Sequence, residues 1–255
     1  MENGLLIGLS RQATLERQLD VVANNIANAN TTGFKSTSSI FQEFLSQGAK
    51  DGTFSAADAP IHFVFDREAW HDFSQGPIQQ TGNPLDVALD GQGFFALQTA
   101  GGERYTRNGS FKINAAGQLV TADGATVEGD NGPITFQVTD RNISVAADGR
   151  VSVIEGVNGA VETLRGRIKM VNFANPQQLA AEGASTFSAP AGIAPQPATN
   201  LRVIQGAVEG SNVNAVAEMT RMIEINRTYS MIASLMQARD DERRNSIDKL
   251  AAVPN

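Results

Sequence analysis

Histidine and carboxylate side chains occur close together between residues 62 and 72, which makes this stretch the first candidate for chemistry. His62 and His71 are the only histidines of the chain, and Asp66, Glu68 and Asp72 lie near them. Imidazole and carboxylate groups are common metal ligands, but this spacing matches no helical or loop pattern of a zinc site. We therefore expect two strand histidines and no bound metal.

Glycine-containing pairs are the second candidate for a ligand site. Asp-Gly pairs at 90–91, 123–124 and 148–149 lack the alternating ligands and the later Glu of a calcium loop, which favours turns. The segments "DGQGFF" and "GGERYTRNG" lack the third glycine of a dinucleotide loop and the lysine of a phosphate loop. No nucleophile-elbow motif occurs. We predict that the chain binds no cofactor and is not an enzyme. A catalytic pair of carboxylates that converge in the fold is the open alternative.

Composition limits the partners that the chain can take. The 255 residues carry a net charge of −7, whereas affinity for nucleic acid needs clustered Lys and Arg, so we expect no nucleic-acid binding. The chain has no cysteine and therefore neither disulfides nor thiolate metal sites. No apolar run approaches the ~20 residues that span a bilayer. The first residues lack a basic segment followed by an apolar core, so we expect no membrane insertion and no cleaved signal peptide.

Each end of the chain carries one apolar stripe with helical spacing. The N-terminal stripe, spaced four, three and four residues apart, consists of Leu15, Leu19, Val22 and Ile26. The C-terminal stripe, spaced three, four, three and four residues apart, consists of Met222, Ile225, Tyr229, Ile232 and Met236. A helix with one apolar face is marginal alone in water. The two terminal helices are therefore predicted to pair as a coiled-coil-like core.

The middle of the chain changes to a period of two residues. Short alternating segments such as "FFALQT" and "ITFQV" are separated by Asn-Gly, Asp-Gly and Gly-Gly pairs, which is typical of antiparallel strands. Asn108-Gly109 is predicted to form a tight turn between strands at Tyr105 and Phe111. The expected fold is α+β. Its predicted parts are a helical core of residues 1–35 with 212–255, an extended connector with some strand at 36–80, and a β-rich domain with a return segment at 81–211.

The segment "NNIANANTTGFKS", residues 24–36, ends the first helix with many asparagines. Gly33 can adopt the left-handed turn that closes a helix, and Lys35 can place positive charge near the negative helix end. One Gly or Asn is enough for a stop, and asparagine is a poor helix former. We therefore expect Asn25 and Asn28 to form hydrogen bonds to another chain.

Three motif regions, in this order, resemble the flagellar axial family, which comprises the rod, hook and hook-associated proteins of the bacterial flagellum. They are "NNIANANTTGFK", the segment 81–127 that begins "TGNPLDVALDGQGFF", and the segment 211–237 that begins "SNVNAVAEMTRMIEINRTYS". The N-terminal "LIGLSRQATLERQLDVVANNIAN" most resembles the proximal rod members. The chain departs from the pattern at Ala215, where relatives commonly place proline.

This resemblance implies a non-enzymatic subunit of the flagellar rod, the helical drive shaft that crosses the periplasm, transmits torque and encloses an export lumen. Its implied partners are copies of itself, other rod proteins and the flagellar type III export apparatus, which uses no cleaved signal. The alternatives are a distal rod or hook-type member of the family, and a surface β-domain that binds carbohydrate or protein. The expected assembly interface is the two apolar stripes above together with Asn25, Asn28, Asn30, Thr31, Gly33, Phe34 and Lys35.

Overall fold

The computed structural model describes residues 2–46, 61–155, 161–183, 185–198 and 201–251, which fold into two units. Unit 1 consists of Met1–Ala27, Thr37–Trp70 and Asn214–Asn255, and unit 2 consists of Asn28–Ser36 and His71–Val213. The chain passes between the two units four times, after residues 27, 36, 70 and 213. Residues 28–36 belong with the β-rich unit, and residues 37–70 belong with the helices.

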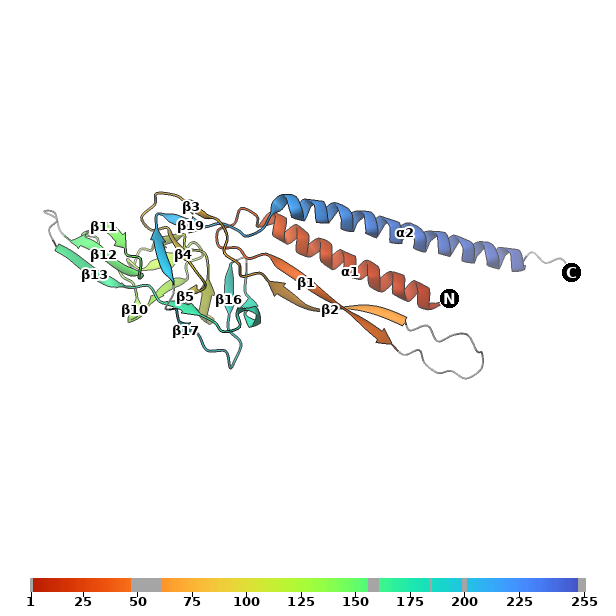
Figure 1. The fold of residues 1–255 in the computed structure, drawn as a ribbon, viewed down its shortest axis with the longest axis horizontal. Coiled ribbons are helices and arrows are strands. Elements are labelled where there is room, and N and C mark those ends of the chain that lie inside the picture. The colour runs from red at the N-terminus through yellow and green to blue at the C-terminus, as the bar shows by residue number, and fades with distance from the viewer. Residues whose placement is uncertain (1, 47–60, 156–160, 184, 199–200, 252–255) are drawn as a thin grey trace. The chain divides into compact units, whose positions relative to one another are not determined.

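Unit 1 contains two helices and a two-stranded sheet. The helices are α1 (Glu2–Ala27) and α2 (Ala215–Ala251), and the strands are β1 (Thr37–Ser46) and β2 (Ile61–His71). Figure 1 shows α1 and α2 side by side, with the start of α1 and the end of α2 at the same end of the pair. The helices are therefore antiparallel. The side chain of His62 lies outside the described residues.

The two predicted stripes form the interface of the helix pair. Leu15, Val22 and Ile225 are buried. The other residues packed against them are Leu19, Ile26, Met222, Tyr229 and Ile232. Met236 packs at Gly8, where an added Cβ would lie 3.1 Å from the Met236 sulfur. The predicted pairing of the terminal helices is confirmed.

The ends of the helices follow from local hydrogen bonds. α1 ends at Ala27, after which Thr31 N donates to Asn28 O and Gly33 adopts a φ of 69°. Asn214 caps α2, because its Oδ1 accepts from Ala217 N at 3.1 Å. α2 therefore begins at Ala215 with Asn214 as its cap.

Unit 2 is built from short strands, and every pairing between its strands is antiparallel. The first strands are β3 (Ile78–Gln80), β4 (Val87–Asp90), β5 (Phe94–Thr99), β6 (Gly102–Thr106), β7 (Phe111–Ile113), β8 (Leu119–Thr121), β9 (Thr126–Gly129) and β10 (Gly132–Pro133). They are followed by β11 (Asp140–Val145), β12 (Arg150–Glu155), β13 (Val161–Arg167), β14 (Met170–Asn172), the short 3-10 helix η1 (Pro176–Gln178), β15 (Ala180–Ala181), β16 (Thr186–Ser188), β17 (Gln196–Pro197), β18 (Arg202–Gln205) and β19 (Ala207–Glu209).

One sheet carries most of these strands. Its main order is β15-β16-β6-β5-β9-β8-β7, with β10, β14 and β17 attached beside it. A three-stranded sheet has the order β11-β12-β13, and the return strands β18 and β19 pair with β4 and β3. The return segment therefore pairs with strands from the start of the unit.

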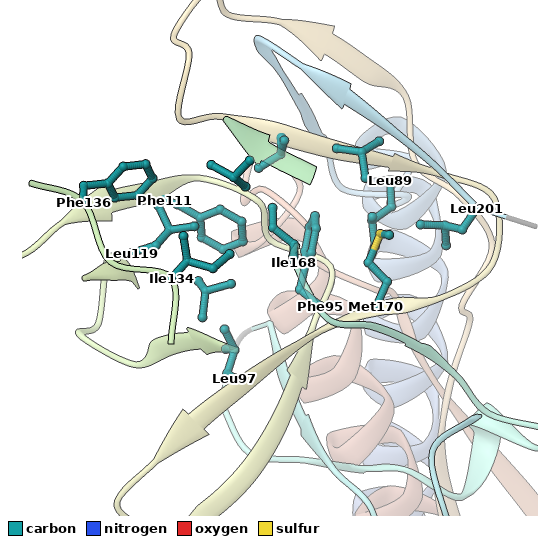
Figure 2. Packing of buried hydrophobic residues seen from close by; sticks show 14 of the residues in the cluster. Leu89, Phe95, Leu97, Phe111, Leu119, Ile134, Phe136, Ile168, Met170 and Leu201 are labelled. Carbon is teal, nitrogen blue, oxygen red and sulfur yellow. The ribbon is translucent and has the colours of Figure 1, made fainter. Parts of the chain in front are cut away.

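Strand β5 is buried on both faces and separates two apolar clusters. Phe95 and Leu97 point into the larger cluster, and Phe94 and Ala96 point into the smaller one. This alternation is the two-residue period of a strand with apolar residues on both faces. Figure 2 shows the larger cluster, in which Phe95, Phe111 and Ile168 pack closely together. Phe95 and Phe111 meet edge to face, with ring centroids 5.1 Å apart.

The predicted hairpin at Asn108-Gly109 is wrong. β6 pairs with β5 and β16, and β7 pairs with β8, so the two flanking strands do not pair with each other. Gly109 instead permits a close approach of β4, because Val87 N donates to Gly109 O at 3.0 Å and a Cβ would lie 1.6 Å from Val87 O. The Asp-Gly turns are confirmed, since Gly91, Gly124 and Gly149 all have positive φ angles.

Candidate assembly site

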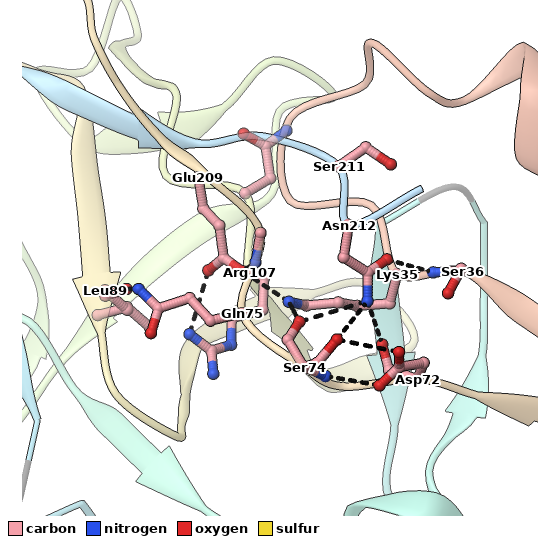
Figure 3. A network of polar contacts seen from close by, with 12 residues as sticks. Lys35, Ser36, Asp72, Ser74, Gln75, Leu89, Arg107, Glu209, Ser211 and Asn212 are labelled. Carbon is pink, nitrogen blue, oxygen red and sulfur yellow. Dashed lines mark hydrogen bonds and ion pairs between the residues drawn. The ribbon is translucent and has the colours of Figure 1, made fainter. Parts of the chain in front are cut away.

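A buried cluster of three charges lies in unit 2. Lys35 Nζ lies 2.6 Å from Glu209 Oε1, and Arg107 Nη1 lies 3.1 Å from Glu209 Oε2. The side chains of Lys35 and Glu209 are 0% exposed. Figure 3 shows the Glu209 carboxylate between the ammonium and the guanidinium group. A single carboxylate therefore holds two buried cations.

Backbone groups complete the surroundings of these charges. Lys35 Nζ also donates to Ser74 O at 2.5 Å, and Arg107 Nη2 donates to Gly91 O at 2.8 Å. Gly76 N donates to Glu209 Oε1 at 2.9 Å. Burial lowers the pKa of Lys35 and of Arg107, and the Glu209 carboxylate opposes both shifts. Without Glu209, two cations would be buried with no carboxylate in contact.

The same cluster fixes the loop that follows α1. Gly33 N donates to Glu209 O at 2.8 Å, and Thr32 Oγ1 donates to Asn108 Oδ1 at 3.0 Å. Asn212 accepts from Ser36 N at 2.7 Å and donates to Asp72 O at 2.7 Å (Figure 3). We call residues 32–36, 72–76, 107–108 and 209–212 the junction. It joins four segments that are far apart in the sequence.

Lys35 was expected to complement the negative end of the first helix, and that prediction is wrong. Its ammonium group donates to Ser74 O and to Glu209 within unit 2. An ammonium has three donors, and two of them are used in these contacts. Sequence reasoning missed Glu209 and Arg107 altogether, because no local pattern links them to Lys35.

Asn25 has partners within its own chain. The side chain is buried, its Nδ2 donates to Thr37 O at 2.8 Å, and its Oδ1 accepts from Thr37 N at 2.9 Å. This pair of bonds replaces a neighbouring strand at the start of β1. These bonds within unit 1 explain why asparagine, a poor helix former, occupies position 25 of α1. Asn28 accepts from Thr31 Oγ1, and Asn30 is exposed.

A polar contact crosses the helix pair. Gln12 Nε2 donates to Tyr229 Oη at 2.6 Å, and Tyr229 Oη donates to Glu16 Oε1 at 3.1 Å. Polar contacts inside an apolar seam favour one register of two helices. The contact at Gly8 and Met236 favours the same register, because a larger residue at position 8 would collide with Met236.

α2 has a second apolar face that α1 does not cover. Its exposed members are Val216, Met219, Ile223, Met231 and Leu235. Two residues along a helix turn the side chain by about 200°, so Ile223 and Ile225 point in opposite directions. Ile225 is 7% exposed and Ile223 is 54% exposed. Val216, Met219 and Ile223 therefore form an exposed apolar stretch on the side opposite to Ile225. Further along the helix, this side is interrupted by polar residues such as Arg227, which is exposed.

The described part of the chain also bears on catalysis and membrane insertion. There, no group of three or more His, Asp or Glu side chains converges as for a metal ion. A cavity of about 690 Å³ lies over β11 and β12, and its lining includes Ser152 and Glu162, which hydrogen-bond to each other. No described helix has both the length and the apolarity for a membrane span.

Three family profiles match successive parts of the chain. They are "Flagella basal body rod protein" at residues 5–35, "Flagellar hook protein FlgE/F/G D1 domain" at 88–153 and "Flagellar basal body rod FlgEFG protein C-terminal" at 204–248. The flagellar basal-body rod protein FlgF of Caulobacter vibrioides is 41% identical over 99% of this chain and 100% of its own length. The chain belongs to the flagellar basal-body rod protein family. It is a structural subunit of the rod and not an enzyme.

Other rod proteins are similar over nearly the same length. FlgF of Escherichia coli is 34% identical and covers 94% of this chain and 95% of its own length. FlgG of Bacillus subtilis is 33% identical, with 94% of this chain and 96% of its own length covered. The predicted family and α+β fold are thus confirmed.

The three matched regions of the rod family meet at the junction. Lys35 is the last residue of the first matched region, Arg107 lies in the second and Glu209 lies in the third. Each region therefore supplies one member of the charged cluster. The residues expected at an assembly interface divide into two groups, since the stripe residues pack within the helix pair while Gly33, Phe34 and Lys35 are buried in unit 2.

Proposed function

We propose that this rod subunit polymerises with copies of itself and with other rod proteins through the uncovered face of α2. The polymer is the helical shaft that crosses the periplasm, transmits motor torque and encloses a lumen for export. Membership of the rod family supports assembly with other axial proteins. The two faces of α2 support the choice of surface.

The uncovered face of α2 is the observation that carries this proposal. An isolated helix pair needs one apolar face on each helix, which the Ile225 side of α2 supplies. The second face exposes large apolar side chains from Val216 to Leu235. Exposed apolar patches on a subunit are typical of protein interfaces. A neighbouring apolar helix would bury this face.

The substitution Ile223→Asp tests the proposed surface. Ile223 is half-exposed, so the change should leave the helicity of the monomer near the wild-type value. It should abolish incorporation into rods, because a carboxylate in an apolar interface costs several kcal/mol. Val138→Asp is the matched control, since Val138 is fully exposed in unit 2 and lies outside the helix. Normal motility of the Ile223→Asp strain would contradict the proposed surface.

The proposed place in the rod is the proximal segment. Within Caulobacter vibrioides, FlgF is 41% identical to this chain and FlgG is 32% identical, which favours the FlgF branch. We further propose export by the flagellar type III apparatus without cleavage. Mass spectrometry of the subunit from purified basal bodies should recover the peptide that contains Met1 to Arg11. Recovery of a subunit trimmed at its N-terminus would contradict uncleaved export.

A further inference from the structure

We propose that the junction is the last part of unit 2 to close during folding, and that its closure distinguishes a complete subunit from an unfinished one. The role in assembly rests on the polymerisation proposed above. The order of closure does not. Glu209 is the group on which both depend, because it contacts Lys35, Arg107 and Gly76.

The contacts of Glu209 span large sequence separations. They join residues 174, 133 and 102 positions apart, for Lys35, Gly76 and Arg107 respectively. Strand pairs such as β5 with β6 are local, since Thr99 pairs with Gly102. Closing a longer loop costs more entropy, so contacts of high separation form later than local hairpins. The hairpins of unit 2 should therefore precede the junction.

Charge burial makes early closure unfavourable. Lys35 and Arg107 are both nearly fully buried when the junction is closed. Before Glu209 is in place they would be two buried cations, which is strongly unfavourable. Asp72 also acts on Lys35 through its charge, but more weakly than Glu209 does. A chain that emerges N-terminus first must therefore keep both cations hydrated until Glu209 is available.

Closure then orders the two segments that connect unit 2 to the helices along the chain. Gly33 N and Ser36 N, in the loop after α1, are bonded to Glu209 O and Asn212 Oδ1. Gly210 N, in the segment before α2, is bonded to Pro77 O. All of these bonds need residues beyond 208. A subunit that lacks its C-terminal part cannot order the loop after α1 in this way.

Pulse-labelling hydrogen exchange during refolding of the full chain tests the order. The hairpin amides of Thr121 and Ala146, bonded to Ala125 O and Arg150 O, are local probes. The amides of Gly33 and Gly76 are the junction probes. We expect the junction probes to become protected at least about tenfold more slowly. Protection of both sets in one phase would overturn the proposed order.

The Glu209→Gln variant tests the charge. In native-state exchange, Gly33 and Gly76 should exchange at least about 100-fold faster than in the wild type, while Thr121 and Ala146 keep their protection. Glu182→Gln is the matched control, because Glu182 pairs with Arg104 at the surface. Equal loss of protection at all four amides would overturn the local role. If Glu209→Gln does not fold, Lys35→Met replaces it. In this variant the Ser36 amide should exchange faster than in the wild type, while the Gly76 amide stays protected because it still donates to Glu209.

Incorporation into rods tests the role of the junction in assembly separately. Glu209→Gln subunits should be incorporated into rods much less than Glu182→Gln subunits, although their hairpins fold. Incorporation at the wild-type level would overturn the role in assembly. A failure of the interface proposed on α2 would show instead with the Ile223→Asp variant, in which the junction is intact.

Discussion

Lys35 and Glu209 form a fully buried ion pair although 174 residues separate them in the sequence. Arg107 shares the same carboxylate, and Gly33 N donates to the backbone carbonyl of Glu209. One residue of β19 therefore secures the loop after α1 and the end of β6.

The stability of unit 2 should depend strongly on Glu209. Glu209→Ala leaves two buried cations without their carboxylate and should lower the free energy of unfolding by about 3–5 kcal/mol. Lys35→Met should cost less, because Glu209 keeps Arg107 and Gly76 N as donors. Urea unfolding measures both. The exposed pair Arg104–Glu182 is the control, and Glu182→Ala should cost less than about 1 kcal/mol. Equal losses at Glu182 and Glu209 would contradict this account.

The helix pair should depend on Ile225. The side chain is buried against α1, so Ile225→Asp places an unpaired carboxylate in the seam at a cost of about 3–5 kcal/mol. Far-UV circular dichroism should show loss of helix while hydrogen exchange shows unit 2 still folded. Ile223→Asp changes the same residue type two positions away and should keep the helicity. A seam in a different place is indicated if both variants retain full helicity.

Gly109 should be sensitive to the smallest substitution. Gly109→Ala would place a Cβ 1.6 Å from Val87 O, so β4 and the loop before β7 must separate. We expect a loss of about 3 kcal/mol or more in the unfolding free energy. At Gly101 the nearest atom to a new Cβ is Arg104 Nη2 at 3.0 Å, which is the far end of a flexible side chain and not backbone, so Gly101→Ala should cost much less. A stable Gly109→Ala protein would show that this approach of the two backbones is not required.

Acidification should destabilise unit 2 through His71. Burial lowers the pKa of His71 below the ordinary value of 6.5, and a hydrogen bond with the Lys35 backbone opposes this shift. Below pH 6.5 the unfolded chain therefore binds a proton that the folded chain excludes. The unfolding free energy should fall as the pH decreases from 6.5, until the pH reaches the folded pKa. Urea titrations of His71→Phe should lack this part of the pH dependence. The same slope in both proteins would assign it to other groups.

The sequence alone was sufficient to predict the two terminal helices and the strand-rich middle of the chain. Leu15 and Ile225 were assigned to the seam correctly, because a helix with one apolar stripe has few ways to bury it. The hairpin predicted at Asn108-Gly109 is wrong because the turn signal is local. The pairing of β6 with β5 and β16 is decided by tertiary packing instead. Asn25 was predicted to bond to another chain, yet its buried amide binds Thr37.

The junction could not be found from the sequence. Lys35 and Glu209 are single charges in segments otherwise poor in charge, Arg107 is one of several charges in its segment, and nothing in the spacing of the three links them. Glu209 is buried because β19 pairs with β3. The paired residues of these two strands are more than 120 positions apart in the sequence. One indication of the junction comes from the family profiles, because each of the three matched regions contains one of these three charged residues.

A map of isolated basal bodies that resolves individual subunits tests the central claim most directly. The account predicts that Ile225 packs against α1 of its own chain while Val216, Met219 and Ile223 are buried against a neighbouring subunit. It also predicts an intact Lys35–Glu209 pair in every assembled copy. A map in which the Ile223 face of α2 is exposed to solvent along the assembled rod would contradict the proposed mode of assembly.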